Sequence, residues 1–417
     1  MQNNTGIYDQ LMEFADSIQI IDTHEHLPPG KNYWGDEADI FTEYFSHYIT
    51  SDLQSAGMSS QDLDKIQNAK LDLIERYKLL EPWLMQVRNT SYYRSLEIAA
   101  GKIHGIDSIS IDTVEELDAR LKKALRQKDY GRYIMKDLCK IEVSINDNWD
   151  DDMLLSTTEL FVPAWQPVAY LNYTGQEPGS VLLQLEHLSL DEYCEHYRQH
   201  FHKQISSGAK VLKFPVAYWR SLYFEDIGKD EAGVLFNDVA KSGQPFPKKL
   251  QDHMMHFILK TAEENNIPVQ IHTGMQEGMG HDLENSDPML LKNLFGKYPG
   301  LTFDLFHTGY PYERELMILA KYYANVYVDF CWSHLISPFA ARNAFYEMLD
   351  VLPYTKIFGF GGDYVFFDGV VGHLALAKQN ICTVLAKKVK KDECNVDFAE
   401  EILKAVLYDN AKKVFRL

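Results

Sequence analysis

Short apolar runs alternate with longer amphipathic stretches through the second half of the chain. Each run ends in a polar residue with Gly or Pro and then passes into a helical pattern. Continuous apolar strands separated by helices are typical of βαβ units on a parallel sheet that is buried on both faces. The predicted strands cover residues 210–214, 268–272, 301–307, 325–330 and 356–363, and the predicted helices cover 249–266, 288–298, 313–324 and 341–352.

The first half of the chain adds three strands and a long helical segment. Residues 18–26 (IQIIDTHEH) predict the first strand, and 141–145 and 159–165 predict the second and third. Residues from about 40 to 135 follow mostly helical patterns, which indicate a helical insertion after the first strand. These elements predict an α/β fold, a (β/α)8 TIM barrel in which residues 1–417 form a single domain. The alternative is an open doubly wound sheet, but no G-x-G-x-x-G turn follows the first strand.

Composition and charge narrow the classes of partner. The chain is 46% hydrophobic and 24% charged, as is ordinary for a soluble enzyme. Its net charge of −19 argues against nucleic acid or anionic membranes as partners, because both need basic patches. The five cysteines include no C-x-x-C pair, which argues against a disulfide framework or a zinc–thiolate site. Without a secretory signal or a membrane-spanning run, we expect a cytoplasmic homo-oligomer that acts on a small molecule.

The first candidate for chemistry is a pair of histidines in the first predicted strand. His24 and His26 are two residues apart, so both side chains leave the same face, as does that of Asp22. Imidazoles are common metal ligands, and two on one strand can reach one ion. Taken alone, the pair is explained equally well by hydrogen bonds at the end of a strand.

Three further residues stand at the ends of later predicted strands. His272 and His307 each end a strand and are followed by Thr-Gly, and Asp363 ends the last one. Parallel barrel strands deliver their last inward side chains to the C-terminal face, where barrel active sites are built. Together with the first pair, these residues supply a full ligand set for a divalent ion, with Zn²⁺ ahead of Mn²⁺ or Fe²⁺.

Other polar residues near the strand ends are candidates for a supporting role. Lys213 ends a strand, and as a carbamate it would bridge to a second metal, whereas the alternative is a lysine that reaches solvent. Arg220 is a candidate clamp for a substrate carboxylate, with a surface arginine as the alternative. Gln276 and the stretch 332–334, which begins with Trp332, are predicted to line the pocket.

The spacing of these residues resembles the amidohydrolase superfamily. DTHEH on the first strand, His on the fifth and sixth, and Asp on the eighth are similar to its pattern. More narrowly, residues 306–330 and 213–222 resemble the amidohydrolase-2 branch, which includes uronate isomerase-like proteins and the nodulin-type domain fused to glutamine synthetase. The second stretch also brings Tyr218 forward as a substrate-binding candidate. The resemblance covers the first strand and most of the chain after residue 200.

The resemblance implies a role for each matching residue. His24, His26 and His272 would bind the metal, and His307 would be a second ligand or an electrophile that faces the substrate. Asp363 would contact the metal-bound water as the general base and return the proton to the leaving group. The ion would lower the pKa of that water and polarise a substrate carbonyl.

The resemblance also leaves two features open. Some branches use a carbamylated lysine to bridge two metals and others have none, so Lys213 leaves one or two ions possible. Asp22 would orient a ligand histidine from behind.

The favoured function is hydrolysis of an amide, lactone or related C–N or C–O bond by metal-activated water. The substrate is expected to be small, polar and carboxylate-bearing. A uronate-type aldose–ketose isomerase is the alternative on the same site, and a decarboxylase is a further one. A non-catalytic scaffold barrel fits least well, because a lost site should show gaps in its ligand set.

Overall fold

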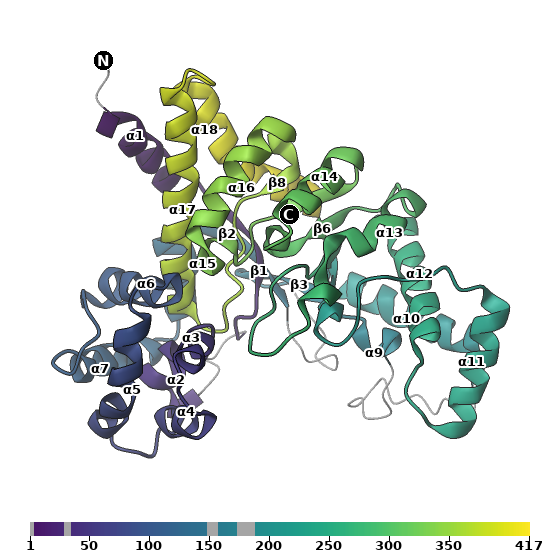
Figure 1. The fold of residues 1–417 in the computed structure, drawn as a ribbon, viewed down its shortest axis with the longest axis horizontal. Helices are drawn as coiled ribbons and strands as arrows, with labels where there is room; N and C mark the ends of the chain where they lie inside the picture. The colour runs from purple at the N-terminus through teal and green to yellow at the C-terminus, as the bar shows by residue number, and fades with distance from the viewer. Residues whose placement is uncertain (1–3, 29–34, 148–156, 173–187) are drawn as a thin grey trace.

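The computed structural model describes residues 4–28, 35–147, 157–172 and 188–417. Eight parallel strands follow one another in chain order around a single sheet, which lies at the centre of Figure 1. Seven of them lie inside the runs predicted from the sequence, and β2 extends two residues beyond its run. The strands are β1 (Ile20–Glu25), β2 (Ile141–Asp147), β3 (Phe161–Trp165), β4 (Val211–Phe214), β5 (Val269–Ile271), β6 (Phe303–Leu305), β7 (Val326–Asp329) and β8 (Ile357–Phe358).

Backbone hydrogen bonds between β1 and the segment after β8 bring the two edges of the sheet together. The Thr23 amide donates to the Phe360 carbonyl (3.1 Å), and the Asp363 amide donates to the His24 carbonyl (2.9 Å). The sheet is therefore a nearly closed barrel surrounded by helices, and the predicted (β/α)8 fold is confirmed.

Helices cover the outside of the barrel. The predicted helices 249–266, 313–324 and 341–352 correspond to α12, α14 and α16, and 288–298 corresponds to a 3₁₀ turn followed by α13. The helices outside the insertion are α1 (Asn4–Ser17), α9 (Val168–Leu171), α10 (Leu190–Ser207), α11 (Lys229–Ser242), α12 (Lys248–Glu264), α13 (Lys292–Lys297), α14 (Glu313–Tyr322), α15 (Ser333–Ile336), α16 (Pro338–Val351), α17 (Phe367–Lys390), α18 (Val396–Lys404) and α19 (Asn410–Phe415).

Local sequence signals fix several helix ends. Helix α10 begins with a capping box in which Ser189 and Glu192 satisfy each other's backbone N–H groups. Helix α16 begins at Pro338, and the Ser337 hydroxyl accepts from the Ala340 amide. These ends orient the helices that lead into and out of the barrel.

The helical insertion lies between β1 and β2, as predicted. It forms the lobe at the lower left of Figure 1, where α6 packs on the long α17. Its buried Arg76 binds Asp39 (Nη2–Oδ1 3.0 Å), and Asp39 also caps the first helix of the insertion. Its helices are α2 (Ile40–Tyr44), α3 (Ile49–Ser55), α4 (Ser60–Gln67), α5 (Leu73–Val87), α6 (Ser91–Ala99), α7 (Val114–Leu125) and α8 (Tyr130–Arg132), with π-helical turns at η2 (Ala100–His104) and η3 (Tyr133–Leu138).

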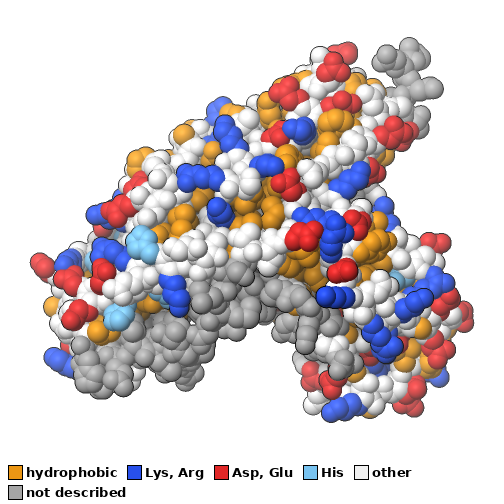
Figure 2. Space-filling view, turned by 180° about the vertical axis from the view of Figure 1, so that it is seen from behind, with side chains coloured by type: hydrophobic (Ala, Val, Ile, Leu, Met, Phe, Trp, Pro, Cys, Tyr) orange, Lys and Arg blue, Asp and Glu red, His pale blue; other side chains and the backbone are white. Residues whose placement is uncertain are grey.

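The surface carries charges of both signs. Lys and Arg side chains are interspersed with Asp and Glu over the face in Figure 2. Among the described residues, no helix is long and apolar enough to cross a membrane. The expected cytoplasmic location, homo-oligomeric state and absence of nucleic-acid or membrane partners stay predictions.

His334 packs between the segment after β8 and helix α17, and it does not line the pocket at the barrel mouth. Its ring is fully buried, its Nε2 is 3.0 Å from the Gly359 carbonyl, and it stacks on Phe330. Burial lowers the pKa of His334 to about 4 from its ordinary 6.5. The prediction that the whole stretch 332–334 lines the pocket is therefore wrong at this residue.

We expect His334 to make the free energy of unfolding rise with pH between about 4 and 6.5. In this window the unfolded chain binds a proton at His334 and the folded chain does not. The difference between the two pKa values corresponds to about 3 kcal/mol of stability. This contribution is complete above pH 6.5 and is lost as the pH falls towards 4.

Urea unfolding of the wild type and His334→Gln at pH 7.5 and 5.0 checks this expectation. Between these pH values the variant should lose about 2 kcal/mol less than the wild type. His202→Gln, an exposed residue of α10, is the matched control and should keep the wild-type pH dependence. Equal pH dependence in His334→Gln and the wild type would contradict the expectation.

Candidate metal centre

Strand β1 and the loop after β8 bring three ligand atoms together at the mouth of the barrel. The Nε2 atoms of His24 and His26 lie 3.2 Å apart. Asp363 Oδ1 lies 3.5 Å from the first and 3.3 Å from the second. Two ligands of one tetrahedral zinc ion, each at about 2.1 Å from it, lie roughly 3.4 Å apart. The edges of this triangle therefore match one face of such a coordination sphere.

Asp363 reaches this position although it lies five residues beyond β8. Its amide bonds to the His24 carbonyl, and the Gly362 amide donates to Asp22 Oδ1 (3.1 Å). A Cβ atom on Gly362 would lie 1.6 Å from Glu25 Oε1, so the loop passes β1 only without a side chain there. Asp22 bonds to backbone amides of His24 and Gly362, so it positions this loop rather than an imidazole, unlike the predicted role.

His272 and His307, at the ends of β5 and β6, form a second pair. His307 Nε2 lies 3.0 Å from His272 Nδ1. The outer nitrogen of His307 lies 2.8 Å from the Cys331 carbonyl, and that of His272 lies 2.8 Å from the Met275 carbonyl. A carbonyl only accepts, so each outer nitrogen carries the hydrogen and the inner nitrogens of two neutral rings present lone pairs to each other. Such a contact is stable only with a proton or another cation beside it.

Burial disfavours the extra proton. It lowers the pKa of His307 to about 4, and burial together with the neighbouring His307 lowers the pKa of His272 well below its ordinary value. Near neutral pH both rings are neutral, so their facing lone pairs fit a site that holds a metal cation. The ligand atoms of His307, Cys331 and Asp363 lie within 4.8 Å of one another, which places this pair beside the first three ligands.

The charges at the first pair also favour a cation. Burial raises the pKa of Asp363, but contacts with His26 and His24 outweigh it and hold that pKa well below the usual range. Burial and then Lys213 lower the pKa of His24, while contact with Asp363 outweighs burial and raises the pKa of His26. The ionised Asp363 carboxylate beside the neutral His24 imidazole is a donor pair for Zn²⁺ and similar divalent ions.

Lys213 of β4 lies inside the site. It is 3% exposed, and its Nζ is 3.4 Å from His24 Nε2 and 4.8 Å from the centre of the Phe306 ring. The alternative of a lysine that reaches solvent is therefore wrong. Carbamylation of this amine stays a prediction.

Three consecutive strand ends carry backbone strain. His307, Trp332 and Asp363 follow β6, β7 and β8 and have φ values of 63°, 58° and 57°, in the left-handed region. This conformation costs about 1–2 kcal/mol for a residue with a side chain. Strained residues cluster at active sites, where surrounding contacts hold them in place. The strain thus points to function at the same rim as the ligand atoms.

A cavity of about 230 Å³ opens over this rim. It is smaller than the roughly 300–1,000 Å³ pockets that hold drug-sized ligands, so it suits a small molecule. Nearly all of its lining residues carry a polar group that could bind a polar molecule. The lining residues are His26, His47, Tyr48, Gln166, Lys213, Pro215, Tyr218, His272, Glu277 and Asp363.

The insertion supplies two pocket residues that the sequence did not predict. Burial lowers the pKa of His47 to about 4, so its ring is neutral at neutral pH. The Tyr48 hydroxyl donates to the Asp363 carbonyl oxygen (2.6 Å). Gln166 and Glu277, from loops after β3 and β5, were also missed. The only sequence signal for His47 and Tyr48 as pocket residues was that they stand together in a segment predicted to be helical.

Two of the predicted substrate-binding residues lie on the loops after β4 and β5. Tyr218 lines the pocket, and its hydroxyl accepts from the Glu277 amide (3.0 Å). Gln276 is 4% exposed and is not among the lining residues, whereas its neighbour Glu277 is. The loop thus turns a different side chain to the pocket than the one predicted.

The other two predicted residues stand behind or outside the pocket. Trp332 is buried, stacks on Tyr48 (4.6 Å between ring centres) and meets His307 edge to face, so it supports the wall. Arg220 is engaged by buried Asp252 (2.5 Å) and by Gln251 (3.0 Å). Neither residue is among those that line the pocket.

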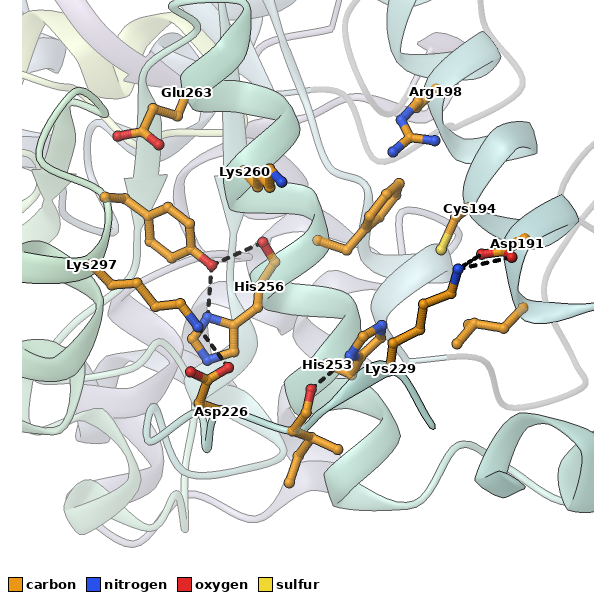
Figure 3. Close-up of a pocket in the computed structure, with 14 residues that line it drawn as sticks. Asp191, Cys194, Arg198, Asp226, Lys229, His253, His256, Lys260, Glu263 and Lys297 are labelled. Carbon is orange, nitrogen blue, oxygen red and sulfur yellow. Dashed lines mark hydrogen bonds and ion pairs between the residues drawn. The ribbon is translucent and has the colours of Figure 1, made fainter. Parts of the chain in front are cut away.

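A larger cavity, of about 470 Å³, lies on the outer face between α10, α12 and α13 (Figure 3). Its principal charges are neutralised in pairs. Lys229 binds Asp191 and Lys297 binds Asp226, each at 2.6 Å. It contains none of the strand-end residues, so the candidate ligand atoms lie at the smaller cavity.

Comparison with known proteins agrees with this geometry. Residues 230–417 match the family model Amidohydro_2, described as amidohydrolase. Protein fluG of Emericella nidulans is 29% identical over 167 residues, which are 38% of this chain and 19% of fluG. The chain thus spans about a fifth of the length of that relative.

Solved structures share the fold over nearly the whole chain. Glucuronate isomerase from Caulobacter crescentus has a TM-score of 0.79 at 20% identity and covers 100% of this chain and 95% of its own. Uronate isomerase from Thermotoga maritima scores 0.78 at 17% identity, with 100% and 99% covered. A Lactobacillus casei protein provisionally named a metal-dependent hydrolase scores 0.69 at 17% identity, with 97% of each chain covered.

The comparisons can now be set beside the barrel and its strand-end residues. The family-model match to residues 230–417 agrees with the amidohydrolase resemblance that the sequence motifs carry, and the solved structures share the fold.

Proposed function

We propose that the chain is a metal-dependent hydrolase that cleaves an amide, lactone or related C–N or C–O bond in a small, carboxylate-bearing substrate. The observation that carries the proposal is the triangle of His24, His26 and Asp363 at the base of a small polar pocket. These residues would hold one divalent ion, Zn²⁺ in first place, with Mn²⁺ or Fe²⁺ as alternatives. When bound, such an ion polarises a carbonyl and makes water a stronger nucleophile at neutral pH.

The chain's own residues supply the proton transfer and the binding of substrate. Asp363 is ionised, so its carboxylate can take a proton from the attacking water and return it to the leaving group. Among the described residues that line the pocket, Lys213 is the one lysine or arginine. We therefore propose that its uncarbamylated amine binds the substrate carboxylate. The Tyr218 hydroxyl lines the same pocket and offers a hydrogen bond to a polar substrate group.

A uronate-type aldose–ketose isomerase is the second candidate. It is supported by the likeness to glucuronate and uronate isomerases over 100% of this chain, insertion included. The insertion brings Tyr48 to the pocket, and an isomerase needs a group that moves a proton between neighbouring carbons. Tyr48, Tyr218 or Asp363 would perform this transfer.

The test combines metal analysis with isotope-labelled water. Elemental analysis should find about one equivalent of divalent ion in the purified protein. Panels of lactones, N-acyl compounds and uronates are then followed by NMR in D₂O and by mass spectrometry in H₂¹⁸O. Incorporation of ¹⁸O into a carboxylic acid product supports hydrolysis, and a ketose that carries deuterium supports isomerisation. If the protein binds no metal and shows no activity after Zn²⁺, Mn²⁺ or Fe²⁺ is added, both the hydrolase and the isomerase proposals are wrong.

A further inference from the structure

A buried carboxylate gathers three parts of the insertion around the start of α17. Asp368 is 2% exposed and lies five residues after Asp363. Its Oδ2 accepts from the Tyr44 hydroxyl (2.9 Å) and lies 2.8 Å from His104 Nε2, and its Oδ1 accepts from the Tyr130 hydroxyl. These donors come from α2, η2 and α8, so one side chain joins three separate elements of the insertion to the barrel.

This cluster is connected to the metal centre by a short path. Tyr44 is the last residue of α2, and the pocket residues His47 and Tyr48 follow in the next turn. The Tyr48 hydroxyl in turn donates to the carbonyl oxygen of Asp363. Two hydrogen bonds, Tyr48 to Asp363 and Tyr44 to Asp368, therefore tie the chain segment 44–48 to the chain segment 363–368 at both ends.

Because Asp368 is buried, its position depends on its three hydrogen-bond donors. A carboxylate without partners is very costly inside a protein, so Asp368 is stable only where its three donors meet it. The adjacent acid Glu43 does not compete for them. Burial, then the charges of Asp368 and Asp39, raise the pKa of Glu43 to about 8, so it is neutral near pH 7.

We infer that Asp368 is a positioning residue for the metal centre. It fixes the end of α2 so that His47 and Tyr48 stand over the pocket. Tyr48 then holds the backbone of Asp363, whose left-handed φ of 57° persists only with such support. The inference rests on the proposed metal site of the preceding subsection.

The experiment measures the metal site directly, with Co²⁺ as the probe. The wild type, Asp368→Asn and Tyr44→Phe are titrated with Co²⁺, and the visible absorption of each saturated protein is recorded. The matched control is Tyr77→Phe, which also removes one buried hydroxyl of the insertion, bonded to the Ile109 carbonyl. Circular dichroism verifies that each variant is folded at the temperature used.

We expect Asp368→Asn to weaken Co²⁺ binding 10- to 100-fold, the range seen when supporting partners of metal ligands are lost. Its saturated Co²⁺ spectrum should differ from that of the wild type, Tyr44→Phe should change both readouts in the same direction, and Tyr77→Phe should change neither. Wild-type affinity and spectrum in a folded Asp368→Asn would overturn the inference while the metal centre stands. If Asp368→Asn does not fold, Tyr44→Phe decides by the same criteria. A wild type that binds no Co²⁺ would overturn the metal centre and this inference together.

Discussion

Asp363→Asn is expected to lower kcat at least about 10³-fold while the divalent ion stays bound. Asparagine keeps an oxygen at the position that faces His24 and His26 Nε2, but it has no basic carboxylate to take up a proton. A positioned general base contributes about 10²–10⁴-fold, and the loss of ligand charge adds to that effect. The measurement is kcat on the substrate that the panels identify, together with elemental analysis of the same sample.

The control for this variant is a second, half-buried acid that is changed in the same way. Asp52 lies in α3, where burial raises the pKa of its carboxyl, and it does not line the pocket. Asp52→Asn should keep turnover within about threefold of the wild type, as is usual for changes outside a site. If Asp363→Asn also keeps wild-type turnover, Asp363 is not the general base.

The strand-end residues were predictable from sequence because the rule that places them is local. A period of two puts His24 and His26 on one face of β1, and this needs no knowledge of the rest of the chain. His272 and His307 follow apolar runs that end at the barrel mouth. For these residues, knowing where each strand ends was enough.

Loop residues were less predictable because tertiary contacts set their directions. Asp363 was read as the end of a strand, yet β8 ends at Phe358 and hydrogen bonds to β1 carry the loop back. Along the loop after β5 no period tells which side chain faces inward, so Gln276 was chosen where Glu277 lines the pocket. The partner of Arg220, Asp252, lies 32 residues away on a helix, and only the fold brings them together.

The insertion shows the same limit on a larger scale. Its helical pattern predicted that it would be helical, but not that His47 and Tyr48 would form one wall of the pocket. That placement depends on contacts with α17, which begins more than 300 residues later in the chain. This wall of the pocket therefore comes from the part of the chain that the sequence describes least, and the candidate metal ligands from the part it describes best.

His24→Ala and His26→Ala are each expected to weaken Zn²⁺ binding at least about 10³-fold, or about 4 kcal/mol. Each of these rings places its Nε2 within 3.5 Å of two other ligand atoms, so its loss leaves two donors of the triangle. His272→Ala is expected to weaken Zn²⁺ binding only about tenfold, as the loss of a residue that supports a metal ligand does. Its outer nitrogen is already bonded to the Met275 carbonyl, and its inner nitrogen faces His307 rather than the triangle.

Competition titration against a chromophoric chelator measures the three affinities, with His202→Ala on the exposed face of α10 as the control. The order of the effects discriminates between two ligand sets. If His272→Ala loses as much affinity as His24→Ala, then His272 is a direct ligand, as the family resemblance implies, and its ring must turn away from the Met275 carbonyl when metal binds. If the Zn²⁺ affinity of His272→Ala falls only about tenfold, the ion is held by the ligands of β1 and the β8 loop alone. His272 and His307 are then left to face the substrate.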